Sequence, residues 1–492
     1  MYNTEKFDKD TFVPQCFESD GEFELRGQKI KYHTVSEDNV FYDDNGKAIA
    51  SIFSYSYFRT DVENSENRPV MFCYNGGPGS SSMYVHAGFF GVKRLKYEEE
   101  IDRPTSLPPY QTIDNPDSLL DICDLVMIDP VGTGYGVLID QSRGKDFYGI
   151  EEDAESILTF IEKWTHKYNR WLSPKYLCGE SYGCTRTAVV AGMAGGGSGN
   201  NRGYGVKFDG LVMIGNTVTT GKYFFHPIPV EEAVVWFPTY AAINWFHNHP
   251  TDQSVDEFAM EAKKFADEEY LVALYKGESL QGEAREAIKK KISYYTGVSD
   301  KFLEDRALRI DDAGFRHEVI KHLGKSVSRY DGRHTRDQLV PYQDEEKKGD
   351  WFDATGNRYD GFFYGALNGV ILPSLNVKMD RQYLTFNLFD DETEDYGHPK
   401  WNINAKGGTT ADRLRQAMVS THGMRTFFAN GWYDDCTDIG LVYYVCDHAG
   451  LPKDRVYIKP YKSGHMIYIS EDNCKELSED IRKFIEGKDP TK

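Results

Sequence analysis

A serine held between two glycines is the residue in this sequence whose setting most clearly suggests chemistry. Within Lys175 to Val190, an apolar run leads into Gly179-Glu180-Ser181-Tyr182-Gly183, and a run with small residues follows. Glycines on both sides of a serine allow a sharp turn from a strand into a helix, which exposes the hydroxyl above the sheet. The same pattern also occurs by chance in loops and at helix N-termini, where the serine is only a cap. Ser181 is therefore a candidate nucleophile that needs a base, an acid and an oxyanion hole from elsewhere in the chain.

Two loops near the end of the chain supply candidates for the acid and the base. A serine hydroxyl is a weak nucleophile, so it requires a base, and the base requires a carboxylate that orients it. Asp434 follows the strand-like run at 425–430, and His465 follows the next such run at 455–459. Ligands and catalytic groups gather at the carboxyl ends of the strands in open α/β sheets. The chain order Ser181, Asp434, His465 is the order found in α/β-hydrolases.

An oxyanion hole would combine two backbone amides near Ser181. One belongs to the residue after the nucleophile, Tyr182, and the other comes from a loop after an earlier strand. Asn75-Gly76-Gly77-Pro78-Gly79 follows an all-apolar run, and its glycines permit a close approach of backbones. Taken alone, this glycine loop is equally consistent with an ordinary turn. Its position relative to the Ser181 motif favours the oxyanion hole.

The elements that would position these residues alternate over the first 216 residues. Residues 21–36 and 46–59 alternate apolar and polar side chains around a turn-like segment at 43–46, which predicts an antiparallel hairpin. Short apolar runs at 69–74, 124–129, 175–178 and 208–216 are typical of strands buried on both faces, and residues 153–168 have helical spacing. Strands that alternate with helices imply a mainly parallel sheet with helices on both faces.

This alternation stops between residues 223 and 421. Helical patterns occupy 256–275, 282–295 and 303–322, and strand signals return only at 425–430, before a closing helix at 470–486. A chain that leaves its sheet for roughly two hundred residues and then returns has an inserted cap. We predict a first part of an α/β-hydrolase core at 1–222, a mostly helical cap or lid at 223–421, and a second part of the core at 422–492 that carries the acid and the base.

Composition excludes several classes of function. The 492 residues exceed the usual size of a single core, and a formal net charge of −20 argues against non-specific binding to nucleic acid or anionic membranes. The N-terminus lacks an apolar signal segment, and no stretch is long and apolar enough to span a bilayer. We therefore expect a cytoplasmic protein, although a mature secreted form would show the same lack of a signal.

Cysteine and histidine spacing indicates neither a disulfide framework nor a metal site. Eight cysteines are sparse for a disulfide scaffold, and Cys73, Cys123 and Cys178 lie in or at the end of apolar runs, where we expect buried thiols. His247 and His249 lack the partner spacing of a metal site. We predict no metal and no cofactor.

Five motifs in order resemble those of a known family. NGGPGSSS, DPVGTGY, GESYG, NGWYDD and GHM closely resemble the motifs of the serine carboxypeptidases, particularly of their bacterial branch. The resemblance extends over nearly the whole chain, including FPTYAAINWFHN and YDGRHTR in the predicted cap. It implies an α/β-hydrolase fold and a serine-type carboxypeptidase that removes single residues from peptides with a free C-terminus, often at acidic pH.

The resemblance also implies roles for the three candidate catalytic residues. Ser181 matches the nucleophile, His465 the base and Asp434 the orienting acid. The acidic loop departs from the family, because relatives commonly have D-L-A-T-P where this chain has Asp434-Asp435-Cys436-Thr437-Asp438. Asp434 keeps the matching offset from Asn-Gly. We therefore expect Asp435 and Asp438 to be solvated loop charges.

Five further residues match binding positions of the family. Gly77 and Tyr182 match the residues whose amides form the oxyanion hole. The resemblance implies that Asn75, Gly76 and Glu180 hold the terminal carboxylate of the substrate.

Two rival functions remain open. An esterase or acyltransferase could use the same scaffold, since an alcohol can intercept an acyl-enzyme as well as water can. A binding protein with an inactive site is the third possibility, and the intact set of Ser181, Asp434 and His465 argues against it. Side-chain preference, the biological substrate and the oligomeric state do not follow from the sequence.

Overall fold

The computed structural model describes residues 12–97, 108–196, 205–221, 229–338, 353–387, 400–403 and 408–492. A ten-stranded sheet forms the centre of this described part, in the order β1-β2-β3-β7-β4-β9-β10-β13-β14, with β8 paired to β3. The first three strands are antiparallel, and β7, β4, β9, β10, β13 and β14 run parallel to one another. The strands of the sheet are β1 Cys16–Leu25, β2 Gln28–Tyr42, β3 Ala48–Arg59, β4 Val70–Tyr74, β7 Asp124–Asp129, β8 Val137–Leu138, β9 Lys175–Glu180, β10 Gly210–Ile214, β13 Arg425–Gly431 and β14 Val456–Tyr461.

Both faces of the parallel strands are buried, as their continuous apolar runs predicted. Along β4, Val70, Phe72 and Tyr74 enter one hydrophobic cluster, which also contains residues of the helices α2 Ile150–Lys167, α3 Tyr182–Ala194 and α14 Thr410–Ser420. Met71 and Cys73 enter a second cluster with residues of α16 Glu471–Ile485 and α12 Ala354–Ala366. Because successive side chains of a strand point to opposite faces, the two clusters are the two sides of the sheet. The predicted α/β-hydrolase class, a mainly parallel sheet with helices on both faces, is confirmed.

The N-terminal strands correct one predicted element. The hairpin around 43–46 is present as β2 and β3, but the run at 21–36 is divided between β1 and β2 by a tight turn at Arg26-Gly27. Both turn residues have positive φ, 54° and 75°. The segment 26–29 interrupts the apolar alternation, which runs over Phe23 and Leu25 and resumes in the opposite phase at Ile30 and Tyr32, and the prediction of one continuous strand passed over this break.

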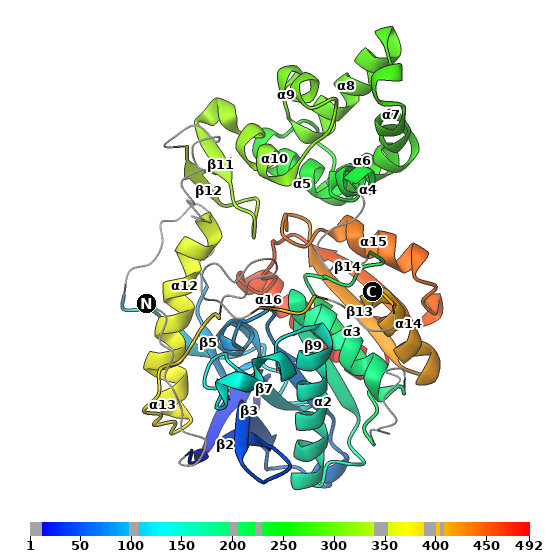
Figure 1. Cartoon of the computed structure of the whole chain (residues 1–492). Coiled ribbons are helices and arrows are strands. Elements are labelled where there is room, and N and C mark those ends of the chain that lie inside the picture. Colours follow the sequence, from blue (N-terminus) through cyan, green and yellow to red (C-terminus); the bar gives the residue numbers. More distant parts are fainter. Residues whose placement is uncertain are drawn as a thin grey trace.

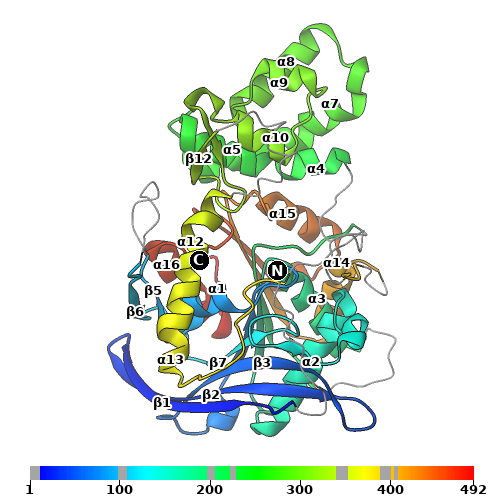
Figure 2. The same cartoon turned by 60° about the vertical axis from the view of Figure 1, so that its left-hand side comes forward.

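Helices α4 to α10 form a lobe set apart from the sheet, seen in green in Figures 1 and 2. The predicted helix at 303–322 is divided here, because α9 ends at Asp305 and α10 begins at Asp312. A π turn at Ala266–Tyr270 joins α6 to α7, and a small hairpin of β11 and β12 follows α10. The elements are α4 Pro229–Val235, α5 Phe237–Asn248, α6 Val255–Phe265, α7 Leu271–Lys276, α8 Gly282–Thr296, α9 Asp300–Asp305, α10 Asp312–Glu318, β11 Lys325–Val327 and β12 Thr335–Asp337.

The later part of the predicted insertion lies along the core. Figure 2 shows α12 and α13 Leu372–Ser374, in yellow, running from the lobe down to β1. There, Ser19 Oγ donates a 3.3 Å hydrogen bond to the Ser374 carbonyl. Helix α14 packs on α3. The domain limits at 223 and 421 stay predictions, and residues 222–228 at the first limit lie outside the described residues.

Short elements complete the connections, and α15 Ile439–His448 lies between β13 and β14. A two-stranded sheet joins β5 Lys93–Leu95 to β6 Thr112–Asp114, and α1 Met83–Val85 continues into a π turn at His86–Phe90. A second π turn, Leu367–Ile371, joins α12 to α13. The 3₁₀ turns are Ser65–Asn67, Gln141–Asp146, Gly277–Ser279, Lys321–Leu323 and Lys453–Arg455.

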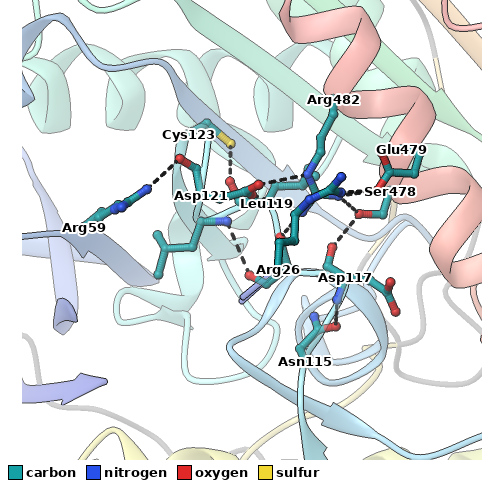
Figure 3. A network of polar contacts seen from close by, with 12 residues as sticks. Arg26, Arg59, Asn115, Asp117, Leu119, Asp121, Cys123, Ser478, Glu479 and Arg482 are labelled. Carbon is teal, nitrogen blue, oxygen red and sulfur yellow. Dashed lines mark hydrogen bonds and ion pairs between the residues drawn. The ribbon is translucent and has the colours of Figure 1, made fainter. Parts of the chain in front are cut away.

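A polar network ties the C-terminal helix to the N-terminal half of the chain (Figure 3). Arg482 of α16 donates two hydrogen bonds, of 3.1 and 3.0 Å, to the carboxylate of Asp121. Arg26 in the β1–β2 turn forms an ion pair with Glu479, and Ser478 Oγ donates to the Asp117 carbonyl at 2.6 Å. These contacts hold α16 against the segment that precedes β7 and against the β1–β2 turn.

All eight cysteines lie in described residues and are free thiols. Cys73, Cys123 and Cys178 are buried, as predicted. No described helix combines the length and apolarity that a membrane crossing requires.

Candidate active site

Ser181 lies at the corner between β9 and α3 with a strained backbone. Its φ of 59° and ψ of −129° fall in a region that non-glycine residues rarely adopt. The corner is held by hydrogen bonds from the Ser181 amide to the Ile214 carbonyl and from the Cys184 amide to the Ser181 carbonyl. A Cβ on Gly179 would lie 2.2 Å from the carbonyl oxygen of Gly183, so only glycine fits at 179, whereas a Cβ on Gly183 would make a tight contact of 3.2 Å with the Asn75 carbonyl oxygen.

His465 and Asp434 form a hydrogen-bonded pair beside this corner. His465 Nδ1 lies 2.9 Å from Asp434 Oδ2. The carboxylate is fixed in turn by the Cys436 and Thr437 amides, each 2.9 Å from Oδ1, and by the Thr437 hydroxyl, 2.6 Å from Oδ2. The three donors hold Asp434 as a carboxylate, which can only accept hydrogen bonds. His465 Nδ1 must therefore carry the proton that it donates to Asp434, and Nε2 is left as the proton acceptor.

The pKa of His465 is set by opposing effects. Burial lowers it, but the Asp434 carboxylate and the nearby Glu180 raise it, and the net shift is upward. Ser181 and His465 line the same pocket. In the part of the chain that is described, no hydrogen bond joins the Ser181 hydroxyl to His465. Such contacts commonly tighten only when substrate is bound.

The loop of Asn75 to Gly79 packs directly against the corner. A Cβ on Gly76 would lie 2.4 Å from the Tyr182 amide nitrogen, so only glycine fits there. Gly77 has a φ of +102°, which is also favourable only for glycine. The structure therefore brings the glycine loop beside the amide that follows Ser181. Both lie at the N-terminus of α3, where the helix dipole favours negative charge.

Asn75 and Glu180 meet at the floor of the pocket. The Asn75 side-chain amide donates a 2.7 Å hydrogen bond to Glu180 Oε1, and its own Oδ1 accepts 3.0 Å from the Val85 amide. Glu180 Oε2 is buried and has no hydrogen-bond partner of ordinary geometry in the described residues. Burial raises the pKa of Glu180 to about 7, although the charge of His465, the nearby Tyr468 hydroxyl and the hydrogen bond from Asn75 lower it.

The Asn-Gly pair before the acid has a packing explanation. A Cβ on Gly431 would lie 2.2 Å from the Ser463 carbonyl oxygen, so this glycine lets the acid loop approach the histidine loop. The Asn430 side chain donates a 2.7 Å hydrogen bond to the Thr437 carbonyl across the acidic loop. The Asn430-Gly431 pair thus precedes the acid because the loops after β13 and β14 are in close contact at the carboxyl ends of the two strands.

A loop of the predicted cap braces the histidine. The His465 amide donates a 2.7 Å hydrogen bond to the Tyr330 carbonyl, and the Tyr330 ring lies 5.5 Å from the imidazole, centroid to centroid. The Gly332 amide donates to the Tyr433 carbonyl at 2.8 Å. The predicted cap therefore contacts both catalytic loops through its YDGR segment.

The expectation that Asp435 and Asp438 are solvated charges is wrong. Both side chains are buried, with 1% or less of their surface exposed. Asp435 Oδ2 accepts a 2.8 Å hydrogen bond from Arg316 of α10, and Asp438 Oδ1 accepts one of 3.0 Å from the Leu441 amide at the start of α15. The sequence did not show that α10 would supply a cation to this loop, so exposure was the default prediction.

The pocket has a volume of about 780 Å³ and combines these residues with groups that the sequence analysis did not select. Asn75, Gly76, Gly77, Glu180, Ser181 and His465 line it together. The unselected lining residues that carry polar groups include Tyr84, Arg329, Tyr330, Asp360 and Tyr364. Their segments are distant in sequence, and among them only Tyr330 belongs to a quoted motif, as the first residue of YDGRHTR.

Arg186 and Thr437 are two further residues that the motifs did not reveal. Arg186 of α3 is buried, donates 2.7 Å hydrogen bonds to the Asn75 carbonyl and to Asp153 Oδ2, and thereby fixes the glycine loop from below. Thr437 contacts both members of the acid–base pair, lying 3.0 Å from His465 Nδ1. Within the described residues, no group of three or more metal-ligating side chains is present. His247 instead contacts the Gly332 carbonyl through Nε2 at 2.7 Å.

Comparison with known proteins agrees with this geometry. Residues 41–278 match the family model described as serine carboxypeptidase. Serine carboxypeptidase-like 20 of Arabidopsis thaliana is 30% identical over 175 residues, which are 34% of this chain and 32% of that protein. The chain thus spans about a third of the length of this curated relative.

The fold agrees as well. The structure of Kex1ΔP, a prohormone-processing carboxypeptidase from Saccharomyces cerevisiae, matches with a TM-score of 0.54 at 15% identity, covering 93% of this chain and 91% of that one. Membership of the bacterial branch stays a prediction. The Ser181 corner, the His465–Asp434 pair and the glycine loop in one pocket thus agree with the match of residues 41–278 to the serine carboxypeptidase family.

Proposed function

We propose that the protein is a serine-type carboxypeptidase that hydrolyses the C-terminal peptide bond of peptides through an acyl-enzyme on Ser181. The observation that supports this most directly is the buried pair of Asn75 and Glu180 beside Ser181. A general esterase has no need of a buried, proton-holding carboxyl next to its nucleophile. A carboxypeptidase needs such a group, because it must bind the free carboxylate of its substrate.

The chemistry follows from the proton positions. Nε2 of His465 takes the proton of the Ser181 hydroxyl as the oxygen attacks the scissile carbonyl, and Asp434 stabilises the imidazolium that forms. The amides of Gly77 and Tyr182 donate hydrogen bonds to the oxyanion, aided by the N-terminus of α3. His465 then passes its proton to the departing amine. Water, activated by the same histidine, finally releases the acid product from Ser181.

The terminal carboxylate of the substrate binds to the group formed by Asn75, Gly76 and Glu180. Glu180, when protonated, donates a hydrogen bond to the terminal carboxylate, and the Asn75 side chain and Gly76 amide donate further ones. Two carboxyl groups at hydrogen-bond distance share one proton, and the raised pKa of Glu180 makes this possible near neutrality. Peptides with a free C-terminus are the proposed partners.

The test compares one peptide as free acid and as C-terminal amide. If Asn75, Gly76 and Glu180 hold the carboxylate, kcat/KM for the amide should be lower by about 10-fold or more, because charged hydrogen bonds are worth about 1.5 to 3 kcal/mol. Products are identified by mass, with Ser181→Ala as the control for contaminating peptidase. Equal rates on acid and amide would indicate an endopeptidase or amidase. Turnover of an activated ester with no peptide cleavage would indicate the esterase or acyltransferase.

A further inference from the structure

The side chain of Arg329 lines the active-site pocket without a partner in the described part of the chain. Its Nε is buried and has no hydrogen-bond partner, and no hydrogen bond or ion pair to a described residue involves its guanidinium. The guanidinium carbon lies 6.0 Å from the centroid of the Tyr330 ring. A buried guanidinium nitrogen without a hydrogen-bond partner is costly, so the position of Arg329 calls for a functional explanation.

The acids closest to Arg329 are occupied by other groups. Asp435 Oδ2 accepts its hydrogen bond from Arg316, which also pairs with Asp312 at 3.1 Å. Asp353 accepts hydrogen bonds from the backbone amide of Arg329 at 2.8 Å and from the Ser328 hydroxyl at 2.7 Å. The acidic neighbours therefore fix the backbone of Arg329 and bind Arg316, while Arg329 itself lines the pocket.

The loop that carries Arg329 is held firmly. The Ser328 hydroxyl lies 2.7 Å from Thr355 Oγ1 at the start of α12 and accepts from the Tyr330 amide at 3.1 Å. The next residue, Tyr330, is joined to His465 by the backbone hydrogen bond described above. Arg329 thus stands at a fixed place, one residue from the segment that contacts the catalytic histidine. Such preorganisation lowers the entropy lost when a ligand binds.

We propose that Arg329 binds the side-chain carboxylate of an aspartate or glutamate next to the scissile bond, and so gives the enzyme a preference for acidic residues. This inference rests on the proposed carboxypeptidase function. Guanidinium and carboxylate match in geometry and form paired hydrogen bonds, which a neutral amide cannot replace equally. The terminal carboxylate of the substrate has its own proposed site at Asn75, Gly76 and Glu180, so Arg329 remains for a second anionic group.

The other acids in the pocket do not oppose an acidic side chain strongly. Glu180 already accepts from Asn75, and Asp360 accepts a 3.0 Å hydrogen bond from the Tyr84 hydroxyl. Burial raises the pKa of both carboxyl groups, which reduces their negative charge at weakly acidic pH.

The experiment uses four peptides of equal length with free C-termini, Ala-Ala-Glu-Ala, Ala-Ala-Gln-Ala, Ala-Ala-Ala-Glu and Ala-Ala-Ala-Gln. The first pair places the charge before the scissile bond, and the second places it on the departing residue. Wild-type protein should have a kcat/KM about 10-fold or more higher for glutamate than for glutamine in one of the pairs, which identifies the position that Arg329 contacts. Equal values in both pairs would overturn the proposal while leaving the carboxypeptidase function intact. No cleavage of any peptide would overturn the function itself.

Variants assign the preference to the residue. In Arg329→Gln, kcat/KM for the glutamate peptide divided by kcat/KM for the matching glutamine peptide should fall to about one. The kcat/KM for the glutamine peptides themselves should stay within about threefold of wild type. Arg329→Lys should restore part of the preference, since it keeps the charge but not the planar fork. Arg309→Gln is the matched control, because Arg309 is an exposed arginine of the same lobe. An equal loss on glutamate and glutamine peptides in Arg329→Gln would instead mean that Arg329 reads the terminal carboxylate or supports the fold, and would overturn the proposal.

Discussion

The side-chain amide of Asn75 donates a 2.7 Å hydrogen bond to Glu180 across 105 residues of sequence. The contact joins the loop after β4 to the end of β9, and it lies directly beside the strained corner of Ser181. Among the described residues, the other oxygen of this buried carboxyl has no hydrogen-bond partner within ordinary distance. Several expected properties of the enzyme depend on this pair, on the triad next to it and on the cap that covers them.

Replacement of the nucleophile should abolish turnover without loss of the fold. Ser181→Ala removes only a hydroxyl from a surface corner, and loss of a triad member typically lowers kcat by ~10⁴ to 10⁶. Peptide cleavage is followed by mass spectrometry, and the fold by the melting temperature. A variant that kept a tenth of the wild-type rate in a peptidase-free preparation would refute the assignment of the nucleophile.

The two neighbouring aspartates should respond differently to substitution by asparagine. Asp434→Asn should lower kcat by roughly 10⁴, because the amide no longer holds His465 in the productive tautomer. Asp435→Asn should keep kcat within about tenfold of wild type, since Asp435 contacts Arg316 and not the histidine. Steady-state kinetics of both variants decide the matter. A large loss at Asp435 together with a nearly normal Asp434→Asn would reassign the acid.

The apparent affinity for free-acid peptides should fall as the pH rises through neutrality. Below the pKa of about 7, Glu180 is protonated and donates to the terminal carboxylate, whereas above it the two negative charges repel, so KM should increase. Glu180→Gln cannot titrate, and its KM should be much flatter between pH 5 and about 8. If both proteins showed the same rise, another group would bind the carboxylate.

The same substitution should change stability in a pH-dependent way. The pKa of Glu180 is raised in the folded state above its ordinary value of 4.5, so the folded protein binds the proton more tightly than the unfolded chain. The free energy of unfolding should then decrease from about pH 4.5 until the pH passes 7, in total by ~3 kcal/mol for this group. Glu180→Gln lacks this decrease. Its melting temperature relative to wild type should therefore rise from pH 5 to pH 8, and a constant difference would contradict the buried titration.

Loss of the ion pair between cap and core should destabilise the protein. Arg316→Gln leaves Asp435 buried without its cation, and removal of one partner of a buried ion pair typically costs about 3 to 5 kcal/mol. We expect a clear drop in melting temperature that is larger at pH 9 than at pH 6. Burial raises the pKa of Asp435 to about 8, and a protonated, neutral Asp435 tolerates the loss of the Arg316 cation better than a charged one does. Lys301→Gln, at an exposed lysine of α9, is the control and should change little.

The triad and its supporting loops were predictable because each depends on a local pattern. Gly179 is required because a Cβ there would lie 2.2 Å from the Gly183 carbonyl oxygen, and such sharp turns leave a recognisable glycine signature. The runs at 70–74 and 124–129 are buried on both faces, so their apolar composition alone indicated central strands. The split of the run at 21–36 was missed although the polar segment 26–29 interrupts the alternation, which resumes in the opposite phase at Ile30 because the chain reverses direction there.

The sequence by itself determined the nucleophile motif, the order of acid and base, and the class of sheet that carries them. Those features depend on short-range backbone geometry and on the periodicity of burial. Only the tertiary structure decided that Asp435 is buried against Arg316 and that Arg329 faces the pocket, because both outcomes depend on how a distant helical lobe packs over the catalytic loops. Charge and burial at such contacts depend on partners more than a hundred residues away, which no local pattern specifies.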